Sequence, residues 1–200
     1  MFGRGNMKES MELLVKRKIS PERWRHSLGV VETAVDLAIF WKCDPYKAKL
    51  AGILHDYARE IPEDLLITLA EKAGHLILEE ERANPVVLHA PVGAFLAETE
   101  LGIKEREVLN AISKHTVGGE PMSLLDKIIF LSDMIEPNRA WLGVEKLRKM
   151  VYNDIDRAML DAIQGTVTYL NKRNLIIHPI TLLTHKSLLL KFENVVENKD

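Results

Sequence analysis

The sequence is poor in the residues and segments that define several classes of protein. Its single cysteine, Cys43, excludes an internal disulfide and is typical of a reducing compartment. No uninterrupted apolar run approaches the roughly 18 residues of a membrane span, and residues 1–8 lack the apolar core of a signal peptide. The formal net charge of -2 offers no basic field for nucleic acid. We therefore expect a cytoplasmic protein that binds neither membranes nor nucleic acids.

Helix-start signals recur along the chain, whereas alternating strand patterns do not exceed four or five residues. Ser20-Pro21-Glu22 combines a hydroxyl cap, a proline at the first helical position and an acid in the first turn. Asp44-Pro45 repeats this signal and predicts the helix that carries His55-Asp56. Ser123 and Asp126 have the spacing of a capping box. The pattern predicts an all-α fold.

The length of 200 residues is typical of one domain, and no linker or repeat divides the chain. We expect residues 1–10 to be flexible and residues 11–200 to form a single helical domain. Within it, the metal-site core is expected at about 20–140, with C-terminal helices over 144–197 packed back on it. The apolar side chains of those helices also favour a homodimer; they are Leu182, Leu183 and Leu188 to Leu190.

Six side chains with nitrogen or oxygen donor atoms are candidate metal ligands. His55 and Asp56 are adjacent, so both can reach one divalent metal. Asp133 follows an apolar run, where a buried carboxylate without a partner would be costly. The full set, which suits a pair of octahedral metals, is His26, His55, Asp56, His89, His115 and Asp133. Two metals indicate hydrolysis of phosphoesters or phosphoanhydrides.

The other three histidines have no acidic residue or histidine at ligand spacing. They are His75, His178 and His185, and we interpret them as ordinary core or surface residues.

Five short blocks around the candidate ligands resemble the HD superfamily of metal-dependent phosphohydrolases. They match most closely its branch of bacterial symmetrical bis(5'-nucleosyl)-tetraphosphatases. The blocks are Arg-Trp-Arg-His-Ser (23–27), His-Asp-Tyr-Ala-Arg (55–59), His-Ala (89–90), His-Thr-Val-Gly (115–118) and Asp-Met-Ile-Glu-Pro-Asn-Arg (133–139). The resemblance covers about residues 10–180 and implies an HD-domain helical bundle with packed C-terminal helices.

The resemblance also implies a ligand scheme for two divalent metals. Asp56 would bridge the ions, with His89 and His115 on the second ion. The first ion would be held by His26, His55, Asp56 and Asp133. Iron is the expected metal, with manganese or magnesium as alternatives, and the histidine-rich set suits magnesium least.

The resemblance further implies catalytic and substrate-binding residues. Asp56 and Arg59 are expected to be catalytic, although Arg59 stands where lysine is common in the family. The expected substrate-binding residues are Arg23, Thr116, Gly118, Glu136 and Arg139. The arginines would neutralise charge on the phosphoryl oxygens, whereas simple surface ion pairs are the alternative. For Gly118, a phosphate-lining backbone and a plain turn remain equally open.

The expected reaction follows from the charge of a polyphosphate. Two cations that share a water lower its pKa, so that a metal-bridged hydroxide exists at neutral pH and attacks phosphorus. The resemblance implies that diadenosine tetraphosphate, or a related dinucleoside polyphosphate, is split symmetrically into two ADP. Three alternatives remain: an HD phosphohydrolase acting on (deoxy)nucleotides or on the guanosine tetraphosphate alarmone, a di-iron oxygenase, and a non-catalytic nucleotide sensor.

Overall fold

The computed structural model describes residues 4–197, and these residues form α-helices and one short 3-10 helix without any strand. The predicted all-α fold is therefore confirmed. The elements are α1 (Arg4–Lys18), α2 (Pro21–Phe40), α3 (Pro45–Leu54), α4 (Glu63–Lys72), α5 (Glu79–Ala83), η1 (Pro85–Leu88), α6 (His89–Thr99), α7 (Arg106–Lys114), α8 (Leu124–Ile135), α9 (Val144–Met150), α10 (Ile155–Lys172) and α11 (Pro179–Glu197).

Local capping determines where several helices begin. The Ser20 hydroxyl accepts a hydrogen bond from the backbone N–H of Arg23 at 3.2 Å and caps α2. The Asp44 carboxylate caps α3 in the same way. At α8, Ser123 and Asp126 exchange backbone and side-chain hydrogen bonds in a capping box. The helix starts predicted from these residues are confirmed.

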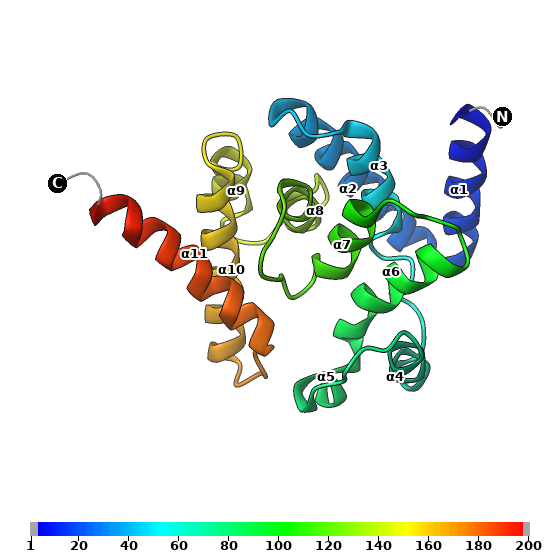
Figure 1. Ribbon diagram of the computed structural model, residues 1–200. Helices are drawn as coiled ribbons and strands as arrows, with labels where there is room; N and C mark the ends of the chain where they lie inside the picture. Colours follow the sequence, from blue (N-terminus) through cyan, green and yellow to red (C-terminus); the bar gives the residue numbers. More distant parts are fainter. Residues whose placement is uncertain (1–3, 198–200) are drawn as a thin grey trace.

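Helices α2, α3, α7 and α8 pack against one another at the centre of the molecule (Figure 1). Helices α4, α5 and α6 gather on one side with η1, while α9, α10 and α11 lie on the opposite side of α8. The hydrophobic core between these groups of helices includes Leu37, Ile112, Ile128 and Met159, all of which are fully buried. Because Met159 belongs to α10, the packing of the C-terminal helices on the core is confirmed.

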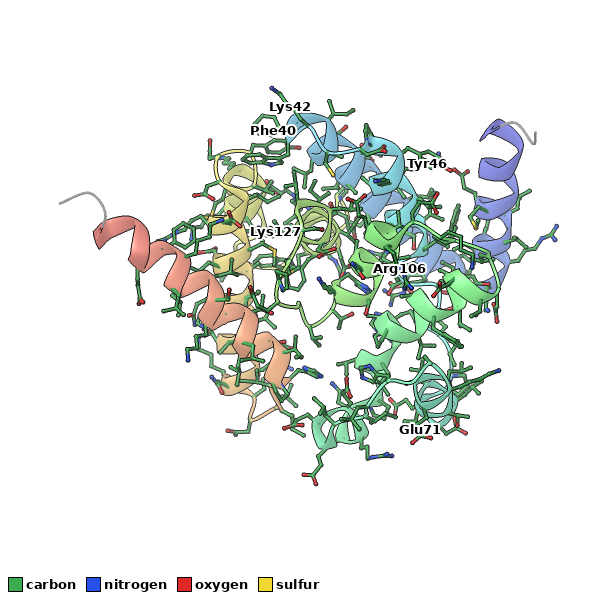
Figure 2. The ribbon with its side chains drawn as sticks, viewed as in Figure 1. Phe40, Lys42, Tyr46, Glu71, Arg106 and Lys127 are labelled. Carbon is green, nitrogen blue, oxygen red and sulfur yellow. The ribbon has the colours of Figure 1, made fainter. Side chains whose placement is uncertain are left out.

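Two aromatic side chains attach the end of α2 to the segment between α9 and α10. Figure 2 shows Phe40 at the end of α2, close to the turn that precedes α10. Its ring meets that of Tyr152 edge to face, with 5.1 Å between the centroids. Next to it, the indole N–H of Trp41 donates to the carbonyl of Val151 at 3.0 Å. These contacts hold α2, which carries His26, against the end of α9.

Helices α1 and α5 begin without any of the start signals found in the sequence. Helix α1 packs on the core through Met11 and Val15. The five-residue helix α5 carries the buried Glu81. The backbone is helical from Arg4 onward, while residues 1–3 lie outside the described part, and the expected flexibility of residues 1–10 stays a prediction.

On α11, Leu188 is buried in the core, whereas Leu182, Leu183, Leu189 and Leu190 remain exposed. The homodimer also stays a prediction. Within residues 4–197, every helix is too short or too polar to cross a lipid bilayer.

Candidate active site

Four imidazoles, each carried in or next to a different helix, converge at the centre of the fold. His26 lies in α2, His55 follows α3, His89 begins α6 and His115 follows α7. The Nε2 atoms of His26 and His55 are 3.3 Å apart, and those of His89 and His115 are 3.1 Å apart. All four residues are buried or nearly so. The sequence-predicted histidines are thus brought together with their Nε2 atoms facing a common space.

The Nδ1 atom of each imidazole is held on the side away from this space. Three of them donate an Nδ1–H hydrogen bond to the carbonyl oxygen of the residue three positions earlier. The pairs are His55 with Gly52 at 2.7 Å, His89 with Val86 at 2.5 Å and His115 with Ile112 at 2.7 Å. Since a carbonyl only accepts, Nδ1 carries the proton and Nε2 presents a lone pair, which is the tautomer and orientation that a metal requires.

The Asp56 carboxylate lies between the two imidazole pairs. Its Oδ2 atom is 3.3 Å from Nε2 of His55 and 3.7 Å from Nε2 of His26. Its Oδ1 atom is 3.2 Å from Nε2 of His89 and 3.8 Å from Nε2 of His115. Two groups of three candidate ligands therefore share one carboxylate. Neutral imidazoles and a bridging carboxylate are a donor set that suits a pair of divalent transition metals.

Asp133, in the last turns of α8, extends the first group. Its Oδ1 atom lies 3.0 Å from Nε2 of His26. Burial would raise the pKa of Asp133, but the hydrogen bond with His26 and the charges around it, that of Arg139 among them, hold this pKa well below its usual range. All six candidate ligands are therefore in one cluster.

The protonation states of Asp56 and His89 also fit metal ligands. Burial alone would raise the pKa of Asp56, but the imidazoles around it hold that pKa well below its usual range. Burial lowers the pKa of His89 and outweighs the hydrogen bond with Asp56, which acts in the other direction. A charged carboxylate and a neutral imidazole are the forms that bind divalent metals.

The helix expected to carry His55 and Asp56 ends one residue earlier, at Leu54. That part of the prediction is wrong, and the reason is local. The carbonyl of Gly52, which an α-helix would bond to the N–H of residue 56, accepts the His55 imidazole instead. The backbone continues in tighter turns, in which the N–H of Tyr57 donates to Leu54. Beyond the end of α3, Nε2 of His55 and Oδ2 of Asp56 lie 3.3 Å apart in the cluster.

Two of the three candidate arginines contact the ligand carboxylates directly. Nη1 of Arg23 lies 2.8 Å from Oδ2 of Asp56. Arg139 donates from Nη2 to Oδ1 of Asp133 at 2.6 Å and from Nε to its backbone carbonyl at 2.8 Å. Arg59 is half-buried. Its guanidinium makes no hydrogen bond or ion pair with any side chain that the structure describes, which are those of residues 11–193. Arg59 is therefore the candidate whose charge is not already engaged.

Glu136 has contacts other than those expected for a substrate-binding residue. Its side chain is 2% exposed and accepts the Nδ1–H of His26 at 3.2 Å. Its other oxygen accepts the backbone and side-chain N–H groups of Asn138 at 2.7 and 2.8 Å. In α2, Gly29 makes room for this carboxylate, because a Cβ there would lie 2.5 Å from Oε2 of Glu136. A glycine inside a helix was the sequence signal for this close approach, and sequence reasoning missed it.

Arg148 of α9 is a second residue that sequence reasoning missed. Its guanidinium donates to the carbonyls of Ile135 at 2.8 Å, Glu136 at 2.7 Å and Arg139 at 2.9 Å. It thereby fixes the end of α8 and the loop that carries Arg139. In the sequence, Arg148 is one of several charged residues of α9, and nothing there distinguishes it from a solvated side chain.

Thr116 and Gly118 follow His115 in the loop after α7. The Thr116 hydroxyl lies 3.2 Å from Nε2 of His115 and 3.3 Å from Nε2 of His89, so it borders the second group of ligands. Gly118 has φ +84°, and a Cβ there would meet the Thr184 hydroxyl at 2.8 Å. Its N–H donates to the carbonyl of Lys114 at 3.0 Å. Of the two readings for Gly118, the contacts favour the turn.

Comparisons with known proteins agree with this geometry. The family model for the HD domain matches residues 23–138. The chain is similar to the symmetrical bis(5'-nucleosyl)-tetraphosphatase of Halalkalibacterium halodurans, with 44% identity over 89% of this chain and 95% of the relative. The protein of that name from Bacillus subtilis is 39% identical over 87% of this chain and 93% of its own length.

A solved structure has the same fold. It is the crystal structure of a predicted HD superfamily hydrolase involved in NAD metabolism from Clostridium acetobutylicum. It superposes with a TM-score of 0.90 and 34% identity, over 92% of this chain and 97% of the other. The chain therefore belongs to the HD-domain hydrolases, in the family of the bacterial symmetrical bis(5'-nucleosyl)-tetraphosphatases.

Proposed function

We propose that this protein hydrolyses diadenosine tetraphosphate at its central phosphoanhydride bond and releases two ADP, using two divalent metal ions. The observation that carries the proposal is the sharing of Asp56 between two groups of candidate ligands. A bridging carboxylate suits two cations held close together, which is the arrangement that supports displacement at phosphorus. The names of the relatives from Halalkalibacterium halodurans and Bacillus subtilis support the same reaction.

The residues of the cluster divide into ligands and phosphate contacts. When bound, the cations supply Lewis-acid polarisation of the phosphoryl oxygens and activation of water at neutral pH. Arg59, whose charge is not engaged by the described side chains, is proposed to contact the phosphate that develops negative charge. Arg23 and Arg139 hold the carboxylates of Asp56 and Asp133 and present their remaining N–H groups to the polyphosphate.

Thr116 and Glu136 complete the proposed assignment. The Thr116 hydroxyl, beside the second group of ligands, is proposed to donate to a phosphoryl oxygen. Glu136 is proposed as a positioning residue for His26, because its oxygens are occupied by His26 and Asn138.

We propose iron as the metal, with manganese as the nearest substitute. Four imidazoles and two carboxylates form a mixed nitrogen and oxygen set that suits iron or manganese, whereas magnesium prefers shells made only of oxygen.

The first test is chromatography of the products after incubation of metal-loaded protein with diadenosine tetraphosphate. Two ADP for each substrate consumed support symmetric cleavage. ATP with AMP contradicts symmetric cleavage and leaves a dimetal phosphohydrolase. Absence of product from protein with bound metal contradicts the proposed substrate.

A second test distinguishes this proposal from the alternative of an alarmone hydrolase that works with a single metal ion. His115 belongs only to the second group of ligands, so His115→Ala should reduce the bound metal from two ions to one per chain and abolish activity. His185→Ala, on α11 and outside the cluster, is the matched control. Full activity in His115→Ala would contradict the two-metal mechanism.

A further inference from the structure

Two histidines that are not part of the metal-ligand cluster converge on one buried carboxylate. Glu81 of α5 is 4% exposed. Nε2 of His75, which follows α4, lies 2.9 and 3.1 Å from its two oxygens. Nε2 of His178, which precedes α11, lies 3.2 Å from Oε1. Two segments distant in the sequence, residues 75–81 and the residue before α11, thus meet at an acid–imidazole group that the proposed reaction leaves unused.

Hydrogen bonds determine the chemical state of this group. The backbone N–H of Ile180 donates to Nδ1 of His178 at 3.2 Å, so Nε2 of His178 carries the proton given to Glu81. The backbone N–H of Leu78 donates to Oε2 at 2.8 Å. Burial would raise the pKa of Glu81, but the Leu78 N–H and the two imidazoles lower it. Glu81 is therefore an ionised carboxylate, and its roughly four acceptor positions face three N–H donors, those of His75, His178 and Leu78.

The group borders a cavity of about 370 Å³. This volume lies in the range of roughly 300–1,000 Å³ that is usual for small-molecule sites. Most of the wall is apolar and consists of Leu76, Leu78, Val87, Pro91, Val117 and Ile180. Apolar walls with a few convergent polar groups are the arrangement that binds flat organic ligands.

The cavity is a neighbour of the metal-ligand cluster. Pro91 and Lys114, in its lining, lie two residues after His89 and one residue before His115. A second cavity of about 170 Å³ is lined by Thr116 and shares Val87, Val117 and His178 with the first. Because the Thr116 hydroxyl contacts both imidazoles of the second ligand group, the cavity that Thr116 lines is a neighbour of that group as well as of the larger cavity.

The charges of the larger cavity exclude a phosphate as its natural occupant. Lys114 supplies the ammonium group of its described lining, and this ammonium already donates to the Pro121 carbonyl at 2.6 Å and to Asp126 at 3.0 Å. The Glu81 carboxylate would repel an anion. A neutral ligand that offers N–H or O–H donors fits, because an ionised carboxylate forms strong hydrogen bonds with such donors.

We propose that this cavity binds one nucleoside end of the dinucleotide substrate, with Glu81 accepting a hydrogen bond from an amino or hydroxyl group of that nucleoside. The proposal rests on the proposed function, which places the phosphates at the metal-ligand cluster. His75 and His178 are positioning residues that hold the carboxylate, and the apolar wall contacts the base.

The test compares binding of ADP and of inorganic pyrophosphate to manganese-loaded protein by calorimetry. Glu81→Gln keeps the size of the side chain and an acceptor for the Leu78 N–H, and it removes the charge. We expect ADP to bind about tenfold more weakly to this variant, because one charge-assisted hydrogen bond is weakened. Pyrophosphate, which lacks a nucleoside, should bind as it does to the unaltered protein. Glu79→Gln, two residues away on the same helix and outside the lining, should change neither.

A second variant keeps the proposal testable if Glu81→Gln fails to fold. Ile180→Trp fills the cavity without altering the carboxylate or the imidazoles, and it should also weaken ADP binding alone. Equal weakening of ADP and pyrophosphate, or unchanged ADP binding in both variants, would overturn the proposal. Because the measurement is binding of a product, it does not depend on turnover. If the variants selectively lose ADP binding but the unaltered protein does not cleave diadenosine tetraphosphate, the proposed function is rejected and the nucleoside site is retained.

Discussion

The Glu136 carboxylate lies 3.2 Å from Nδ1 of His26, so the residue at the end of α8 orients a candidate ligand in α2. The other three imidazoles of the cluster donate Nδ1–H to backbone carbonyls. His26 alone among them donates to a carboxylate, which fixes its tautomer and makes Nε2 more basic. The first ligand group therefore depends on a contact between segments 110 residues apart.

Replacing Glu136 by glutamine should weaken metal binding while the fold is retained. The amide keeps the volume and an acceptor oxygen, but the negative charge behind His26 is lost. Loss of such a partner typically costs 10–100-fold in metal affinity or activity. We expect a change in that range in the Kd for manganese, measured by calorimetry. Glu32→Gln, an exposed residue of α2, serves as the control, and equal manganese affinity in both variants would show that Glu136 is only a packing residue.

Substitution of Arg59 should reduce turnover with little effect on stability. Its guanidinium has no described ion pair to lose, so Arg59→Ala should lower kcat by about 10²–10³-fold, as removal of one oxyanion donor does. Arg139→Ala, which breaks the contact with Asp133, should additionally lower Tm and metal content. Arg59→Lys should recover most of the turnover. Steady-state rates and thermal melts distinguish the variants; unchanged kcat in Arg59→Ala would remove this residue from the mechanism.

Arg148→Ala should destabilise the protein and loosen the loop that carries Arg139. The substitution removes three hydrogen bonds to backbone carbonyls at the end of α8. Carbonyls left without a partner cost about 1–3 kcal/mol, so we expect the free energy of unfolding in urea to fall by about 2 kcal/mol and KM to rise. Lys149→Ala, an exposed neighbour on α9, should leave both values unchanged. An unaltered KM would separate Arg148 from the site.

An ion-pair network between α8, α10 and α11 predicts a pH-dependent contribution to stability. The Asp156 carboxylate of α10 accepts from Lys127 of α8 at 2.7 Å (Figure 2) and also from Lys191 of α11. Burial would raise the pKa of Asp156, but the two lysines lower it below the ordinary value of 3.8. The depressed pKa stabilises the fold above pH 3.8, and this contribution is lost as the pH falls through the folded-state pKa.

We therefore expect Asp156→Asn to lower the free energy of unfolding by about 1 kcal/mol at neutral pH, the upper value for a partly exposed ion pair. The difference from the unaltered protein should shrink as the pH falls below 3.8. Urea unfolding of both proteins across this range is the measurement. A difference that does not depend on pH would assign the effect to packing.

Several helix boundaries have local causes and can be predicted from neighbouring residues alone. The caps at Ser20, Asp44 and Ser123 bond to N–H groups within three residues, so the starts of α2, α3 and α8 were readable. The candidate ligands can also be identified from the sequence, because the short blocks that contain these histidines and aspartates resemble those of a known family. The end of α3 was misplaced because a side chain, His55, takes the carbonyl that the helix would use.

Which of these residues meet, and which contacts hold them, depends on the packing of helices that are far apart in the sequence. The Glu136–His26 and Glu81–His178 contacts join residues 110 and 97 positions apart. No periodicity or capping signal links such pairs, since they depend on how whole helices pack. For the same reason His178, isolated in the sequence, became part of a buried acid–imidazole group beside a cavity. Short-range hydrogen bonds depend on neighbouring residues and can be predicted from them. The metal-ligand cluster and the Glu81 group instead form because helices that are distant in the sequence bury their side chains around one core.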